Sequence, residues 1–143
     1  MKSCYETDFS QWAFEQADLL RAGKLSELDI ENVLEELESM GKNDQRGYIS
    51  SFRNLLSHLL KWQYQSEKRS SSWVNTIRRS RDEILDWEED NTSFIPKRDD
   101  FIDKAYKRAK KNASTETQLP QSLFPSSCPW DFETFMHNDF FPD

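Results

Sequence analysis

The chain has 143 residues, with 19 Lys and Arg against 26 Asp and Glu, and a net charge of −7. Its 36% hydrophobic and 13% aromatic content is too high for a disordered chain, while three glycines are too few for a turn-rich all-β fold or a phosphate-binding glycine loop. Two cysteines exclude a disulfide framework, and no apolar run reaches the roughly 20 residues of a membrane span. We therefore expect a single reduced, cytoplasmic domain over residues 1–143, with no membrane partner.

The first predicted helix is amphipathic and has a recognisable start and end. Asp8 is a good N-cap, and Phe9, Trp12 and Leu20 then recur at the spacing of one helix face. Gly23 is a plausible stop.

A second helix is expected from Ser26 or Asp29 to Gly41. Its apolar and acidic side chains lie on different faces: Ile30, Val33, Leu34 and Leu37 line one, and Glu31, Glu35 and Glu38 line the other. A turn at Gly41 would make this helix an antiparallel neighbour of the next one.

The third predicted helix, about 44–65, is the most apolar and is expected at the centre of a bundle. A fourth follows the serines at 70–72 and ends in the acidic run 88–91, which we expect to be solvated. Pro96 predicts a break, and a fifth helix is predicted from Asp99 to about Lys111. The fold class is therefore all-α, a single bundle of five or six helices over residues 1–118.

The last segment, residues 119–143, is rich in aromatics and prolines and has no positive charge. We expect it to pack on the bundle as an arm, with one short helix near 131–137, because so much apolar surface is unfavourable in water. Trp130 and at least two of four phenylalanines are expected to be mostly buried, the four being Phe124, Phe132, Phe135 and Phe140.

Four blocks of the sequence, taken in order, carry a resemblance to a known family. They are Tyr5-Glu6-x-Asp8-Phe9-x-x-Trp12; Leu28-Asp29-x-Glu31-Asn32-x-x-Glu35-Glu36-x-Glu38-Ser39-Met40-Gly41; His58-Leu59-Leu60-Lys61-Trp62-Gln63-Tyr64-Gln65 with Ser72-Trp73 and Ile77-Arg78; and Pro129-Trp130 with Asp139-Phe140-Phe141-Pro142. Together they resemble the bacterial domain of unknown function family 29 (DUF29) over nearly the whole chain. The resemblance implies an almost entirely helical fold and no catalytic residues, since the family's activity is not established.

Charge is unevenly distributed along the chain. Residues 46–111 hold 15 basic and 10 acidic side chains, whereas the segments on either side are acidic. Cations and aromatics alternate within this basic segment, and Lys61, Tyr64, Arg69 and Arg78 are the candidate binding residues for a nucleic acid. The overall charge of −7 opposes a phosphate backbone, so internal neutralisation by the acidic ends is the preferred interpretation.

His58 is the strongest candidate for chemistry, either as a general base or as a ligand beside Glu35 or Glu38. Arg69 completes this candidate catalytic set. The competing interpretation is a histidine at the edge of the core, hydrogen-bonded to one carboxylate, and a solvated acidic helix face. No His pair has metal-ligand spacing, so we expect no metal and no cofactor.

Two functional hypotheses follow. The first is a non-enzymatic intracellular protein-interaction module with an unknown protein partner or self-association. The alternative is a small bacterial enzyme or nucleic-acid-acting protein of toxin or nuclease type, which would use His58, the second-helix carboxylates and the fourth-helix arginines. Convergence of His58, Glu35 and Arg69 would favour the enzyme, whereas an exposed apolar patch would favour the interaction module.

Overall fold

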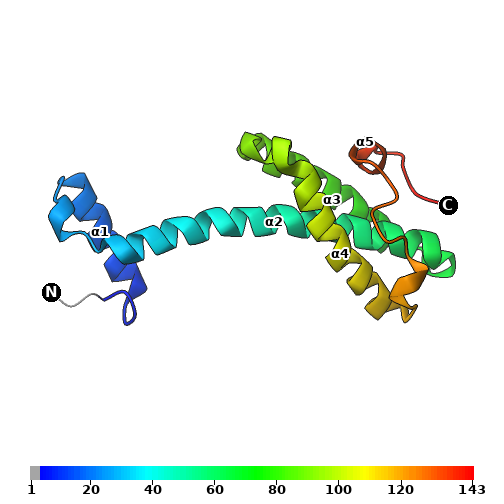
Figure 1. Cartoon of the computed structure of the whole chain (residues 1–143), viewed down its shortest axis with the longest axis horizontal. Helices are drawn as coiled ribbons and strands as arrows, with labels where there is room; N and C mark the ends of the chain where they lie inside the picture. Colours follow the sequence, from blue (N-terminus) through cyan, green and yellow to red (C-terminus); the bar gives the residue numbers. More distant parts are fainter. Residues whose placement is uncertain (1–3) are drawn as a thin grey trace. The chain divides into compact units, whose positions relative to one another are not determined.

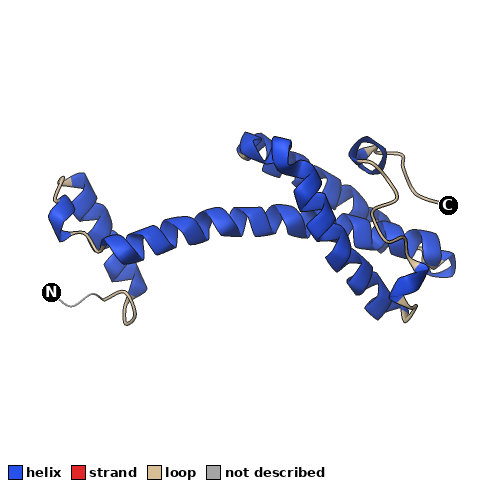
Figure 2. Cartoon of the chain, viewed as in Figure 1, coloured by secondary structure: helices blue, strands red, loops and turns tan. Residues whose placement is uncertain are grey.

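The structure, a computed structural model, describes residues 4–143. Within that range 77% of the residues are helical and there is no strand (Figure 2). Five α-helices and four short 3-10 turns account for the helical residues between positions 4 and 143. The predicted all-α fold class is confirmed. In the described range, no helix combines the length and the apolar character needed to cross a membrane.

The chain divides into two compact units, Met1–Asn43 and Asp44–Asp143. Helix α1 (Phe9–Arg21), the 3-10 turn η1 (Leu25–Glu27) and the first part of helix α2 (Ile30–Tyr64) form the described part of the N-terminal unit. The rest of α2 and all later elements form the C-terminal unit. The single domain predicted from the sequence stays a prediction.

Helix α1 begins and ends where the sequence predicts. The Asp8 side chain accepts a hydrogen bond from the Gln11 backbone N–H at 3.1 Å, so one of the unpaired N–H groups of the first turn is satisfied. The helix ends at Arg21, and Gly23 follows with φ of +73°. Glycine suits this left-handed conformation because it has no Cβ.

The predicted break at Gly41 is wrong, because α2 is helical from Ile30 to Tyr64. A glycine inside a helix costs only about 1 kcal/mol relative to alanine, which the neighbouring helical residues offset. Outside the adjoining backbone of the helix, no atom lies within 4 Å of the position of a Cβ on Gly41, so packing does not require a glycine there.

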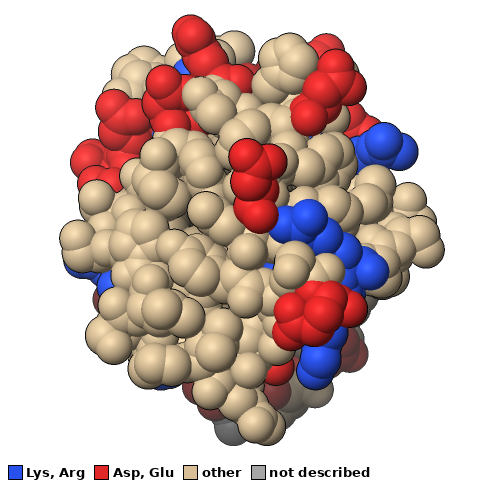
Figure 3. Space-filling view, turned by 90° about the vertical axis from the view of Figure 1, so that its right-hand side faces the viewer, with Lys and Arg blue, Asp and Glu red and all other residues tan. Residues whose placement is uncertain are grey.

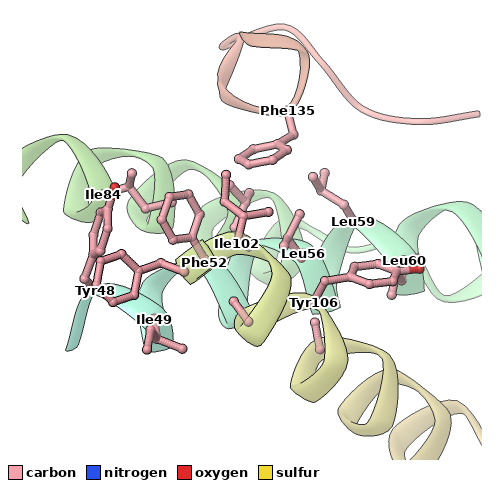
Figure 4. Close-up of a cluster of buried hydrophobic side chains, with 14 of the residues drawn as sticks. Tyr48, Ile49, Phe52, Leu56, Leu59, Leu60, Ile84, Ile102, Tyr106 and Phe135 are labelled. Carbon is pink, nitrogen blue, oxygen red and sulfur yellow. The ribbon is translucent and has the colours of Figure 1, made fainter. Parts of the chain in front are cut away.

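The core of the C-terminal unit lies between α2, helix α3 (Ser71–Asp90) and helix α4 (Arg98–Thr117) (Figure 1). Ser70 caps α3 by accepting from the Trp73 N–H at 3.3 Å. The buried side chains come from all three helices and include Tyr48, Phe52, Leu55, Leu56, Leu59, Leu60, Ile77, Ile84, Phe101, Ile102 and Tyr106 (Figure 4). The broad apolar arc of residues 44–65 is therefore central, as predicted.

The end of α3 differs from the prediction, because Glu88 is buried rather than solvated. Its carboxylate accepts the Tyr48 hydroxyl at 2.5 Å and two bonds from the Arg98 guanidinium at 2.7 and 2.8 Å. The Arg98 guanidinium also stacks 3.7 Å from the Phe132 ring centroid. A buried carboxylate needs such partners, and these come from positions far apart in the sequence.

Helix α4 continues past the predicted end at Lys111 to Thr117. Ala113 and Thr117 are buried there, so tertiary packing extends the helix. Gln118 then adopts the left-handed conformation, with φ of 63°, and its N–H donates to the Ser114 carbonyl. The 3-10 turns η2 (Ser66–Lys68), η3 (Thr92–Lys97, which contains Pro96) and η4 (Gln121–Leu123) connect the remaining elements.

The arm packs against the C-terminal unit, and its short helix α5 (Phe132–Met136) lies where the sequence predicts it. Phe124 and Phe135 are buried, and their rings pack edge-on against Tyr64 and Phe52 of α2. Figure 4 shows Phe135 reaching from α5 towards the core side chains. Trp130 is mostly buried, as predicted, and packs against the core and on Phe140 of the arm itself.

Arg81 of α3 fastens the arm. Its side chain is 2% exposed and donates to the backbone carbonyls of Phe135 at 2.9 Å, Asn138 at 3.2 Å and Phe140 at 2.6 Å. Burial lowers the pKa of this guanidinium from its ordinary value. Arg69 makes a second connection through the carbonyl of Asp143 at 2.9 Å.

Candidate functional site

The structure gives no support to the candidate catalytic set in which His58 lies beside Glu35 or Glu38. That candidate depended on a turn at Gly41, which lies instead inside α2. The two glutamates belong to the N-terminal unit and His58 to the C-terminal unit. Among residues 4–143, no group of three His, Cys, Asp or Glu side chains is arranged to hold a metal ion.

His58 is half-buried, and its Nδ1 donates to the Asn54 carbonyl at 2.8 Å. Burial lowers the pKa of His58, and the nearby Lys61 ammonium lowers it further. Both effects favour the neutral form of the ring. This is the environment of a core-edge histidine, as in the competing interpretation, but the hydrogen bond goes to the Asn54 backbone carbonyl and not to a carboxylate.

Three of the four candidate binding residues already have partners inside the C-terminal unit. Lys61 is buried, forms a 2.7 Å ion pair with Glu116 and lies 5.1 Å from the Trp73 ring centroid. The Tyr64 ring packs on Phe124. Arg69 donates to the Trp62 carbonyl at 2.9 Å, in addition to its bond with the arm.

Arg78, the fourth candidate, is exposed on α3. On the face of the molecule drawn in Figure 3, one small patch of Lys and Arg side chains has acidic groups beside it, other cations stand apart, and most of the face is uncharged. Internal pairing therefore explains much of the cation–aromatic alternation in the sequence.

The N-terminal unit has a different character, because a polar network holds α1 against the start of α2. The Asp29 carboxylate accepts from the Trp12 indole N–H at 3.0 Å and from the Asn32 amide at 2.8 Å. The Gln16 side-chain oxygen accepts the Asp29 backbone N–H at 2.8 Å. Together these bonds fix the angle at which α2 begins.

Tyr5 makes a further link between the two helices by donating its hydroxyl to the Glu36 carboxylate. This bond, followed by desolvation, raises the pKa of Tyr5 to about 12. The Tyr5 ring also packs edge-on against Trp12, with centroids 4.7 Å apart. Glu36 therefore marks the side of α2 that faces Tyr5.

Most large apolar side chains of this unit remain in solvent. Trp12 is the one buried hydrophobic residue among positions 4–43, whereas eight large hydrophobic residues there are exposed: Phe9, Phe14, Leu20, Leu25, Ile30, Leu34, Leu37 and Met40. A unit of about 40 residues with so small a core usually depends on disulfides, metals or association for its stability. Cys4, its one cysteine, is a free thiol.

Three of the exposed residues form a continuous strip. Ile30, Leu34 and Leu37 are 56%, 52% and 60% exposed and recur at spacings of four and three. At about 100° per residue they lie within about 60° of arc on α2. We call these three residues the α2 strip. The sequence placed them correctly on one face, but it did not distinguish a face that packs in a core from one left exposed.

Carboxylates line one side of the strip. Glu31, Glu35 and Glu38 are exposed and follow the same spacing, displaced by about 100° around the helix. We call them the acidic border. The candidates Glu35 and Glu38 are thus neighbours of an exposed apolar face. In the sequence, the carboxylates beside the apolar stripe were the one pattern that could have indicated this surface.

A groove in the N-terminal unit also combines apolar and acidic side chains. It encloses about 710 Å³ between α1, η1 and the start of α2. Four of its ten lining residues are carboxylates, and the full set is Trp12, Glu15, Gln16, Asp18, Leu19, Ala22, Lys24, Ser26, Glu27 and Asp29. The N-terminal unit therefore presents apolar surface next to negative charge at two places.

Comparison with known proteins places the chain in a family. The model of the domain of unknown function DUF29 matches residues 4–141, so the chain belongs to this family. The resemblance found in the four sequence blocks is confirmed at the level of the family. No curated protein and no solved structure matches the chain.

Proposed function

We propose that this DUF29 chain is a non-enzymatic protein-interaction module, whose contact surface is the N-terminal unit. The observation that carries the proposal is the exposure of eight large hydrophobic residues in a unit with one buried hydrophobic residue. A contiguous exposed apolar face is characteristic of a surface that another protein covers. An intracellular, cytoplasmic location belongs to the same proposal.

The contrast between the two units supports this assignment. The C-terminal unit buries its apolar residues in a shared core, and its buried charged side chains Lys61, Arg81 and Glu88 have partners at hydrogen-bond distance. Its buried apolar and charged side chains are thus already satisfied within the unit, so they do not require a partner protein. The alternative of an enzyme or nucleic-acid-acting protein centred on His58 has no such supporting observation and stays a prediction from the sequence.

Affinity capture from the native cell tests the proposal. The full-length chain and a Leu34→Asp, Leu37→Asp variant are used as bait, and the captured proteins are identified by mass spectrometry. Leu85→Asp is the matched control, because Leu85 is 54% exposed on α3 of the other unit. We expect proteins that bind the unchanged chain and the control but not the double variant. If all three baits recover the same proteins, the N-terminal unit is not the contact surface.

A further inference from the structure

We infer that the occupant of the α2 strip is a basic amphipathic helix supplied by another protein. This inference rests on the proposed function and specifies its partner. The strip has the spacing with which one helix packs along another, since Ile30, Leu34 and Leu37 repeat at four and three residues. It lies on a regular helix, so its geometry is already formed before the partner binds.

The acidic border determines the charge of the partner. Glu31, Glu35 and Glu38 have no salt bridge with any cation among residues 4–143. Lys42 is the one basic residue that follows within a turn of this border. A helix with leucines on one face and lysines or arginines beside them would cover the strip and pair with these carboxylates.

Charge also argues against a second copy of the chain. The N-terminal unit, residues 1–43, holds ten acidic and four basic side chains. In a two-fold antiparallel pairing centred on the strip, Glu31 of one copy would lie near Glu38 of the other. Like charges at such flanking positions oppose helix pairing. The strip therefore favours a partner of the opposite charge.

The groove in the same unit points to the same class of partner. Trp12, Leu19 and Ala22 provide apolar surface within it, while Glu15 and Glu27 provide carboxylates. The aliphatic stem of a lysine or arginine side chain suits such apolar surface, with its cation at the carboxylates. Both features of the unit thus select a cationic, partly apolar partner.

Titration with synthetic helices tests the inference. The probe is a fluorescently labelled 18-residue peptide with leucines at helical spacing and lysines elsewhere, and a second peptide replaces every lysine with glutamate. Binding to the full chain is measured by fluorescence anisotropy. We expect the lysine peptide to bind, its affinity to fall about tenfold between 50 and 500 mM NaCl because salt screens the charges, and the glutamate peptide not to bind.

Matched variants separate the strip from general charge attraction. Glu31→Gln, Glu35→Gln, Glu38→Gln is compared with Asp82→Asn, Asp86→Asn, Glu89→Gln, which removes three exposed carboxylates at the same spacing from α3. We expect about tenfold weaker binding for the first variant and less than twofold for the second. Leu34→Asp should weaken binding more than tenfold although it adds negative charge.

Four results would overturn the inference. Equal effects of the two triple variants would show general charge attraction, and equal binding of both peptides would show that charge does not select the partner. Failure of the lysine peptide to bind would also reject a basic helix. A chain that sediments as a dimer, and as a monomer after Leu34→Asp, would identify a second copy as the occupant. That last result would leave the proposed function standing, whereas failure of the capture experiment would reject both.

Discussion

Gly47 offers a sharp test of how α2 and α3 pack. A Cβ added at this position would overlap the six-membered ring of Trp87, with Cζ2 nearest, Cη2 at 2.8 Å and Cε2 at 3.0 Å. Replacing a glycine inside a helix by alanine ordinarily stabilises the helix by about 1 kcal/mol. We expect Gly47→Ala to destabilise the C-terminal unit instead, because the indole must move away from α2.

The size of the clash can be isolated with a double-mutant cycle. Forcing extra atoms into a packed contact typically costs about 1–3 kcal/mol. The higher helix propensity of alanine offsets about 1 kcal/mol of this cost. Gly47→Ala alone should therefore lower the free energy of unfolding by up to about 2 kcal/mol. In a Trp87→Ala background the ring is absent, and the same substitution should be stabilising. The coupling energy between the two positions is expected to be about 1–3 kcal/mol.

Urea unfolding followed by circular dichroism at 222 nm measures the four free energies of this cycle. Gly41→Ala in the same helix is the control for propensity alone, because no atom outside the adjoining helix backbone lies within 4 Å of its added Cβ. We expect Gly41→Ala to raise the stability of its part of the helix. A Gly47→Ala variant that gains stability in both backgrounds would refute the close approach of Trp87 to α2.

Three further predictions concern the C-terminal unit. Leu56→Ala should lower the free energy of unfolding in urea by about 2–5 kcal/mol, because Leu56 is fully buried. Arg81→Met should speed hydrogen exchange in residues 135–141 while the slowest amides of α2 change little, since three carbonyls of the arm lose their donor. Lowering the pH from 7 towards 5 should destabilise the unit through His58, because its folded pKa is lowered and the unfolded state takes up the proton first. This contribution is present above the unfolded pKa of about 6.5, and His58→Gln should flatten the pH dependence of stability measured in urea.

Local sequence signals predicted the helix ends that depend on local bonds. Asp8 caps a helix as expected, and Ser70 caps the helix that was predicted to follow the serines at 70–72. Asp131 caps the short helix of the arm by accepting from the Thr134 N–H at 2.8 Å. Features decided by tertiary contacts were not predictable in this way. Glu88 looks like part of a solvated acidic run, yet its partners are Tyr48, forty residues earlier, and Arg98, ten residues later. Gly41 is a stop signal of only about 1 kcal/mol, and a long helix overrides it.

The candidate site also could not be predicted from local sequence signals. An apolar stripe such as Ile30, Leu34 and Leu37 has the same spacing whether it packs inside its own chain or stays exposed. Only the structure distinguishes it from the stripe of Phe52, Leu55 and Leu59, which is buried. Likewise, Lys61 and Arg69 read as a binding surface in the sequence because their partners, Glu116 and the last residues of the arm, are distant along the chain.

The bonds of Arg81 have a consequence for how this sequence can diverge. Its three acceptors are backbone oxygens, so the bonds do not depend on which side chains stand at Asn138 and Phe140. We therefore expect the polar side chains of the arm to vary among related proteins without loss of the hydrogen bonds from Arg81. Arg81 itself cannot be replaced in this way. The ammonium group of a lysine could not reach all three carbonyls that the planar guanidinium of Arg81 contacts. We expect substitutions among the side chains of the arm to be tolerated, and substitutions of Arg81 to destabilise the contact.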